Sequence, residues 1–426
     1  MGKEHINKKK RKNLLLSLVI IVAVLALLVF VLIAIDKKNK IKKSLDYTEA
    51  GKVDFANKNY ESAIANFKKS INLNPNNYLN YFLLASSYEK LGDEDKAIKF
   101  YRKSLSLNPK NSDVFRLLGG VYYRIGEYEI AIPQFKKAIA LNPADYLTYL
   151  DLGNLYLQLG IYERAVNTFQ KTLALKYYDY RTFYGLGLAY YKQEDYRNAY
   201  LNLKQAYSLK PNDKAVTYYL LNTMNALGLY DESIQLAKEK LATEKNNSHY
   251  IRIISISYFM KNDLSNAFEN AQTAAKIEPD YYGNSLNLAF NYLISGKKQE
   301  AIDQFQTSLE IWKDNSGFEG LALSYYLNKD NENYQKYLKK TSLYQSNNFA
   351  LSMLGFAMLN LKEYDKAIEE FNKATINTPE YYLPYKGLGK VYKAMGDREK
   401  TLKNLEKSFQ LYNEDKEVTV LLQVSE

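Results

Sequence analysis

Apolar and small residues recur at helical spacing along most of the chain, most clearly between residues 112 and 145. The first half of this stretch predicts a helix over about 113–124, because its apolar and small residues lie three and four positions apart. The second half predicts another helix over about 129–141 for the same reason. Gly126 lies between them, where a left-handed C-terminal cap favours a residue without Cβ, and Pro143 ends the second helix. Such a hairpin cannot bury its own apolar face and needs neighbours.

Proline sets the register of further hairpins. Six of the eight prolines occupy one repeat position: Pro75, Pro109, Pro143, Pro211, Pro279 and Pro379. The intervals are multiples of 34 residues up to Pro279, and the last interval is two residues short, a loss that we place in the loop around 328–330. The pattern predicts eleven units over residues 44–415, which begin at 44, 78, 112, 146, 180, 214, 248, 282, 316, 348 and 382.

Most units carry a small residue in the first helix, an aromatic residue three places later and an alanine in the second helix. A small residue lets two helices approach closely, and the other two fill the space between them. These residues and the proline resemble the tetratricopeptide repeat family over about nine-tenths of the chain. The resemblance implies an all-α, right-handed superhelical solenoid whose first helices line a concave groove. The units at 214 and 316 depart most from the pattern, either as hinges or partner sites or as drifted structural repeats.

The ends of the chain differ from the repeats. Residues 1–13 form a basic tail, Leu14–Ile35 is apolar except for Ser17, and residues 36–43 form a basic linker. A helix of 22 residues is about 33 Å long and spans a bilayer, which predicts one transmembrane helix before the repeats. A signal peptide is the competing interpretation, but its apolar core is usually shorter and is followed by a small-residue cleavage site. At the other end, residues 416–426 predict a helix that caps the solenoid.

The charge distribution suits a membrane anchor. The formal net charge is +11, and residues 1–43 hold a net +9 of it, so the repeats are nearly neutral and nucleic acid is not expected as a partner. Basic residues flank both ends of the apolar segment, so orientation is weakly specified. A short basic amino terminus favours an inner-membrane protein with repeats outside the cytoplasm, in the periplasm of a bacterium.

The sequence contains no feature that predicts catalysis. It has no cysteine and two histidines, His5 in the basic tail and His249, which we place at an exposed helix start. No segment remains for a catalytic domain outside the anchor and the repeats. We therefore expect neither an enzyme nor a bound metal, cofactor or small-molecule substrate.

The groove positions not needed for packing are the candidate partner-binding residues. Aromatic rings with a few arginines are typical of protein interfaces, and packing against the next repeat is the competing interpretation. The candidates are Arg116, Tyr123, Asn154, Arg181, Tyr184, Leu188, Tyr191, Tyr218, Tyr219, Asn222, Arg252 and Phe259. Near the carboxyl end Lys386, Lys390 and Lys393 share one helix face, which we interpret as a solvated charge stripe.

Two functions fit these features. The first is a membrane-anchored scaffold whose groove binds other envelope proteins. In a spirochaete the chain would resemble the tetratricopeptide proteins of the periplasmic collar around the flagellar motor. The second is a cytoplasm-facing receptor or regulator that recruits a soluble client to the membrane. The sequence leaves open the partner, the binding face, the oligomeric state and the organism.

Overall fold

The computed structural model describes residues 2–175, 178–344 and 347–425, with side chains at residue 18 and from residue 20 onward. Every regular element in this part is an α-helix, which confirms the predicted all-α class. Side chains of the basic tail and of the first residues of the predicted span lie outside the described part. Two compact units divide the chain, Met1–Leu155 (unit 1) and Tyr156–Glu426 (unit 2).

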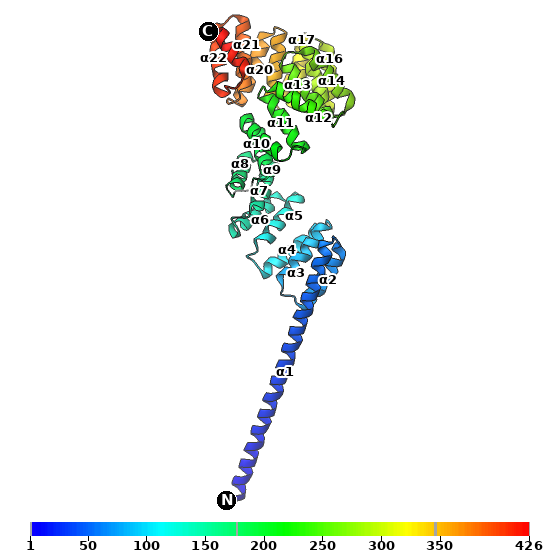
Figure 1. The fold of residues 1–426 in the computed structure, drawn as a ribbon, viewed down its shortest axis with the longest axis vertical. Coiled ribbons are helices and arrows are strands. Elements are labelled where there is room, and N and C mark those ends of the chain that lie inside the picture. The colour runs from blue at the N-terminus through cyan, green and yellow to red at the C-terminus, as the bar shows by residue number, and fades with distance from the viewer. Residues whose placement is uncertain (1, 176–177, 345–346, 426) are drawn as a thin grey trace. The chain divides into compact units, whose positions relative to one another are not determined.

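Unit 1 is a run of helical hairpins that follows a long amino-terminal helix (Figure 1). The division between the units falls within α7. The helices up to this point are α1 (Gly2–Ala56), α2 (Tyr60–Leu73), α3 (Tyr78–Lys90), α4 (Glu94–Leu107), α5 (Ser112–Arg124), α6 (Tyr128–Leu141) and α7 (Tyr146–Gln158).

Unit 2 continues the same hairpin pattern. Its helices are α8 (Tyr162–Ala174), α9 (Tyr180–Lys192), α10 (Tyr196–Leu209), α11 (Lys214–Ala226), α12 (Tyr230–Leu241), α13 (Ser248–Met260), α14 (Leu264–Ile277), α15 (Tyr282–Ile294), α16 (Lys298–Ile311), α17 (Asn315–Leu327), α18 (Asn331–Thr341), α19 (Asn348–Asn360), α20 (Tyr364–Asn377), α21 (Tyr382–Met395), α22 (Arg398–Leu411) and α23 (Lys416–Ser425). Their first helices begin within one residue of the sequence-derived repeat starts.

The amino-terminal helix has no break between the apolar segment and the first repeat. α1 runs from Gly2 to Ala56, so residues 36–43, which the sequence predicted as a linker, are helical. Its apolar side chains between residues 20 and 35 are exposed, and only its last part packs against α2 and α3. Among the described residues this is the one helix that is long and apolar enough to cross a membrane.

Local features follow the sequence rules. Asp93 caps α4 by accepting a hydrogen bond from the amide of Lys96 at 3.1 Å, because helix amino termini leave N–H groups unpaired. Gly126 has a φ of +83°, the left-handed conformation expected of it. A Cβ at Gly119 would lie 3.0 Å from the ring of Phe135, so close helix approach explains the small residue of the repeat.

The predicted location of the two missing residues is wrong. Loop 328–330 has three residues, the same length as the equivalent loops 91–93 and 361–363. One residue is missing from the connection 312–314, since neighbouring repeats have four residues there. The other is missing across α18 and the following connection, because α18 has 11 residues where α16 and α20 have 14. The unit predicted at 316 therefore begins at Asn315 and has a shortened second helix.

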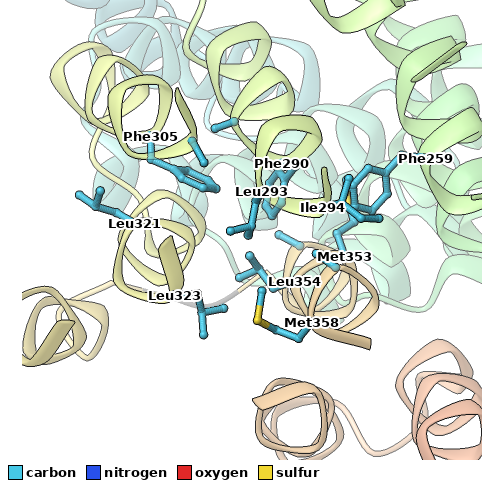
Figure 2. Close-up of a cluster of buried hydrophobic side chains, with 14 of the residues drawn as sticks. Phe259, Phe290, Leu293, Ile294, Phe305, Leu321, Leu323, Met353, Leu354 and Met358 are labelled. Atoms are coloured by element: carbon cyan, nitrogen blue, oxygen red, sulfur yellow. The ribbon is translucent and has the colours of Figure 1, made fainter. Parts of the chain in front are cut away.

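The core of unit 2 lies where this short repeat brings its two neighbours together. α15 and α19 belong to repeats on either side of α17–α18, yet they contact each other directly. Figure 2 shows Leu293 of α15 facing Leu354 of α19, both of them buried. Each such buried side chain stabilises the fold by roughly 2 kcal/mol. Gly320 permits α17 to pack closely on α16, since a Cβ there would lie 2.2 Å from the ring of Phe305.

Unit 2 also closes on itself. Tyr381, just before α21, packs against Tyr196 of α10 with ring centroids 5.1 Å apart, and its hydroxyl donates to the carbonyl of Ala226 at 3.2 Å. Asn348 and Thr378 both donate to Glu194 Oε2, at 2.5 and 2.9 Å. These hydrogen bonds join residues 154 to 184 positions apart. We call this set of residues the closing contact.

Candidate functional site

Three of the candidate partner-binding residues lie in unit 1. Arg116 of α5 lies 3.5 Å from the carboxylates of both Asp145 and Asp151, and its side chain is 22% exposed. Tyr123 packs against Tyr128 with ring centroids 5.8 Å apart. Asn154 of α7 is exposed. Unit 1 therefore contributes a paired arginine, a half-buried ring and an exposed amide to the candidate set.

A second ion pair borders the same repeats. Arg124 lies 2.9 Å from Glu89, which also accepts a hydrogen bond from the hydroxyl of Tyr101 at 2.5 Å. Burial and the neighbouring Glu89 carboxylate raise the pKa of Tyr101, so its phenol stays protonated as the donor. Arg116 and Arg124 are thus both paired with carboxylates.

In unit 2 the candidate tyrosines form a continuous row. Tyr184 of α9 and Tyr219 of α11 have ring centroids 6.1 Å apart, Tyr191 lies 5.3 Å from Tyr219, and Tyr218 lies 4.9 Å from it. Burial raises the pKa of Tyr184 to about 12 and shifts Tyr191 and Tyr219 in the same direction. The rings are half-buried, largely against one another, so packing accounts for much of their surface.

The remaining candidates differ in exposure. Arg181 is exposed and lies 2.5 Å from Asp179, Leu188 is half-buried, and Asn222 donates to the carbonyl of Tyr218 at 2.7 Å. Phe259 is 2% exposed and packs in the core with Phe290, so it does not present its ring to a partner. For Phe259 the packing interpretation holds.

Two further expectations about charged groups are wrong. His249 is not at an exposed helix start, because it stacks on Tyr218 with centroids 4.2 Å apart, and burial lowers its pKa well below the usual 6.5. Lys386 is not part of a solvated stripe, because it is 3% exposed and pairs with Asp415 at 2.9 Å and Glu417 at 2.6 Å. It holds α21 to the carboxyl-terminal helix α23.

A partly open cavity of about 180 Å³ lies in the groove of unit 2. Arg252 of α13 lies beside it, with Nη2 2.7 Å from His249 Nδ1 and its guanidinium 5.4 Å from the ring centroid of Tyr281. Rings and amides form most of the wall: Tyr191, Tyr196, Tyr218, Tyr281, Tyr282, Phe290, Asn222, Asn225 and Asn287. The site brings Tyr191, Tyr218, Asn222 and Arg252 of the predicted set together.

Sequence reasoning missed Tyr281, Tyr282 and Asn287 as members of this site. Tyr281 lies just before α15, and Tyr282 and Asn287 lie within it. A tyrosine or an asparagine at a groove-facing position is only a weak indication of a binding site in the sequence. It also missed the closing contact, for which the sequence carries no local signal.

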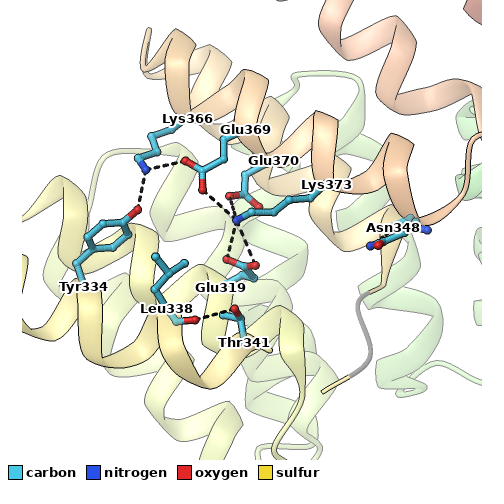
Figure 3. A network of polar contacts seen from close by, with 10 residues as sticks. Glu319, Tyr334, Leu338, Thr341, Asn348, Lys366, Glu369, Glu370 and Lys373 are labelled. Carbon is cyan, nitrogen blue, oxygen red and sulfur yellow. Dashed lines mark hydrogen bonds and ion pairs between the residues drawn. The ribbon is translucent and has the colours of Figure 1, made fainter. Parts of the chain in front are cut away.

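A cluster of charged groups ties α17 to α20. Figure 3 shows Lys373 between Glu319, Glu369 and Glu370, at 3.3, 3.2 and 2.8 Å. Burial and the neighbouring Glu319 carboxylate raise the pKa of Glu370 to about 7. Among the described residues no group of three or more acids and histidines is arranged to hold a metal ion. We therefore interpret the cluster as a network of ion pairs that joins α17 to α20.

Family models match several of the hairpins. Tetratricopeptide repeat models match residues 119–160, 148–178 and 180–213. A model described as Regulator of microtubule dynamics protein 1-3 matches residues 52–117. The chain therefore carries tetratricopeptide repeats, as the proline register predicted.

Solved structures similar to the chain include MamA, YrrB and PilF. MamA is 26% identical, with 40% of this chain and 93% of MamA covered and a TM-score of 0.37. YrrB, described as a TPR protein with an unusual peptide-binding site, is 22% identical, with 43% and 95% covered and a TM-score of 0.41. PilF of Pseudomonas aeruginosa is 19% identical, with 50% and 96% covered and a TM-score of 0.45. No curated protein matches the chain.

Proposed function

Because the chain carries tetratricopeptide repeats, we propose that it is a membrane-anchored scaffold that binds other proteins and assembles a cell-envelope complex. The observation that carries this proposal is the continuity of α1, which runs without a break from the apolar segment into the first repeat. The scaffold acts by binding alone, since a tether raises the local concentration of partners without any chemistry.

The anchor in this proposal is Leu14–Ile35. The apolar residues described within it are exposed and have no packing partner inside the fold, as a lipid-facing helix requires. A cleaved signal sequence is the competing assignment for a helix so near the amino terminus. The mass of the protein purified from membranes distinguishes the two, because cleavage removes about 35 residues.

The partner surface in this proposal starts in unit 1. Arg116 and Asn154 keep accessible polar atoms on one face of unit 1, and Arg181 does so at the start of unit 2. An arginine whose carboxylate partners lie at 3.5 Å can exchange them for a partner's carboxylate at little cost, because the pair is partly solvated. The tyrosine row of unit 2 is half-buried and offers less free surface.

Membrane topology tests the proposal first. We place the repeats in the periplasm, so a reporter that is active only outside the cytoplasm, fused after Glu426, is expected to be active. An intact, membrane-bound but inactive fusion would refute the periplasmic scaffold. It would favour the alternative, a cytoplasm-facing receptor that recruits a soluble client.

Crosslinking identifies the partner. A photoreactive residue at Asn154 or Arg181 is expected to capture envelope proteins, whereas one at the buried Phe259 serves as the matched negative control. In a spirochaete the collar around the flagellar motor is the first complex to examine. Crosslinks that contain only cytosolic proteins would contradict this assignment.

A further inference from the structure

Arg252 of α13 carries a buried positive charge. It is 8% exposed, and its Nε makes no hydrogen bond. Its polar neighbour is His249, whose ring accepts a hydrogen bond at 2.7 Å and stays neutral because burial and the guanidinium lower its pKa. No ion pair forms on Arg252 within the described residues. Such burial costs several kcal/mol unless an anion compensates the charge.

The cavity beside Arg252 has the size and wall chemistry of a small-ligand site. Its volume is about 180 Å³, and an apolar cavity of about 150 Å³ accommodates a benzene ring. Tyr218, Tyr281 and Tyr282 supply ring faces, and Asn287 presents an Oδ1 that accepts no hydrogen bond. Ring-lined pockets with a few convergent polar groups are typical of small-molecule sites.

We propose that this cavity binds a small organic acid, with its carboxylate on the guanidinium of Arg252 and a planar, ring-sized body between the tyrosine rings. A carboxylate matches the two parallel N–H groups of a guanidinium and forms short, charge-assisted hydrogen bonds. A volume of about 180 Å³ accommodates a ring-sized molecule, which favours a free small molecule over a segment of another chain. The site is independent of the protein-binding surface proposed above.

The cavity wall also limits the ligand's charge. Asp314 lines the same cavity, and its Oδ1 accepts the amide hydrogen of Gly317 at 2.9 Å as the cap of α17. Arg252 is the one lysine or arginine among the described residues that line the cavity, so the cavity favours a monoanion over a phosphate, whose second charge would lack a compensating cation. Inorganic phosphate is therefore expected to bind poorly.

The test uses the full chain in detergent with benzoate as the probe and benzamide as its neutral match. Isothermal titration calorimetry is expected to show one binding site for benzoate. Benzamide and phosphate are expected to bind with an affinity at least tenfold lower. Arg252→Gln is expected to weaken benzoate binding at least tenfold, and Arg252→Lys, which keeps the charge but not the planar fork, less strongly. Arg124→Gln is the control, because Arg124 lies in unit 1 and is already paired with Glu89; its benzoate binding should be unchanged.

Thermal unfolding separates a ligand site from a structural arginine. Without ligand, Arg252→Gln is expected to melt at the same or a higher temperature, since it removes an uncompensated buried charge. The proposal is overturned if benzoate does not bind, if it binds Arg252→Gln equally well, or if that variant melts lower than the wild type. Binding of a peptide with a free carboxyl terminus in place of benzoate would also overturn it, in favour of a site for chain ends.

Discussion

Arg116 in unit 1 and Arg252 in unit 2 occupy the same position of their repeats and have opposite environments. Arg116 is 22% exposed and has two carboxylates at 3.5 Å, whereas Arg252 is 8% exposed and has a neutral imidazole as its closest partner. The repeat pattern places both side chains on the inner face of a first helix. The curvature of the surrounding hairpins decides which one keeps access to water.

A pair of tyrosines shows the same difference. Tyr123 and Tyr128 in unit 1 have ring centroids 5.8 Å apart, and the equivalent Tyr191 and Tyr196 in unit 2 are 5.7 Å apart. Tyr128 is half-buried, but Tyr196 is 6% exposed because Tyr381 covers it. Two ring pairs with nearly the same separation therefore differ in burial, because a distant repeat covers only the pair in unit 2.

The largest expected effect comes from breaking the closing contact. Tyr381→Ala removes a buried ring and the hydrogen bond to Ala226, so it should lower the free energy of unfolding of unit 2 by about 3–5 kcal/mol. Tyr128→Ala, the unit 1 control, should cost about 1 kcal/mol, since it loses one aromatic pair. Hydrogen exchange of α10 and α21 measures the first effect. Equal losses of unfolding free energy in Tyr381→Ala and Tyr128→Ala would show that the closing contact does not stabilise unit 2.

The next effect is a pH dependence confined to unit 2. The pKa of Glu370 is about 7 in the folded protein and lies near 4.5 when unfolded, so folding favours its protonated form. Stability should therefore fall as pH rises from about 4.5 to 7, by at most about 3 kcal/mol. Denaturant midpoints between pH 5 and 8 check this. Glu370→Gln should flatten the slope, and an unchanged slope would assign it to other groups.

Packing glycines give a smaller effect with opposite signs. A Cβ at Gly387 of unit 2 would lie 2.2 Å from the Phe371 ring, so Gly387→Ala should destabilise by about 1–3 kcal/mol. Gly120 of unit 1 has its nearest neighbour at 3.9 Å, so Gly120→Ala should stabilise α5 by up to about 1 kcal/mol. The melting temperatures of both variants test this prediction. A higher melting temperature for Gly387→Ala than for the wild type would contradict the packing argument.

Helix caps should give the smallest effect and the same effect in both units. Asn111 caps α5 and Asn247 caps α13, the helices that carry Arg116 and Arg252. Replacing either by Ala should cost about 1 kcal/mol, because a cap hydrogen bond depends on one helix end alone. Exchange of the amides in the first turn of each helix measures this. A much larger loss at Asn247 would mean that the closed ring amplifies local changes.

The sequence by itself determined the repeat frame. Helix starts, the cap at Asp93 and the left-handed Gly126 depend on neighbouring residues, and the packing of Gly119 on Phe135 depends on the partner helix of one hairpin. It also predicted Arg252 and Tyr218 as inner-face residues. These features are readable because their determinants lie within one repeat.

Only the tertiary structure decided which inner-face residues are free. The burial of His249 and the pairing of Lys386 depend on neighbouring repeats, and the cover that Tyr381 places on Tyr196 depends on a repeat far along the chain. The contact of α15 with α19, on either side of the shortened repeat at Asn315, also joins repeats that are not consecutive. Small rotations add up from repeat to repeat, so contacts between residues more than 150 positions apart follow from the whole path and not from any single motif.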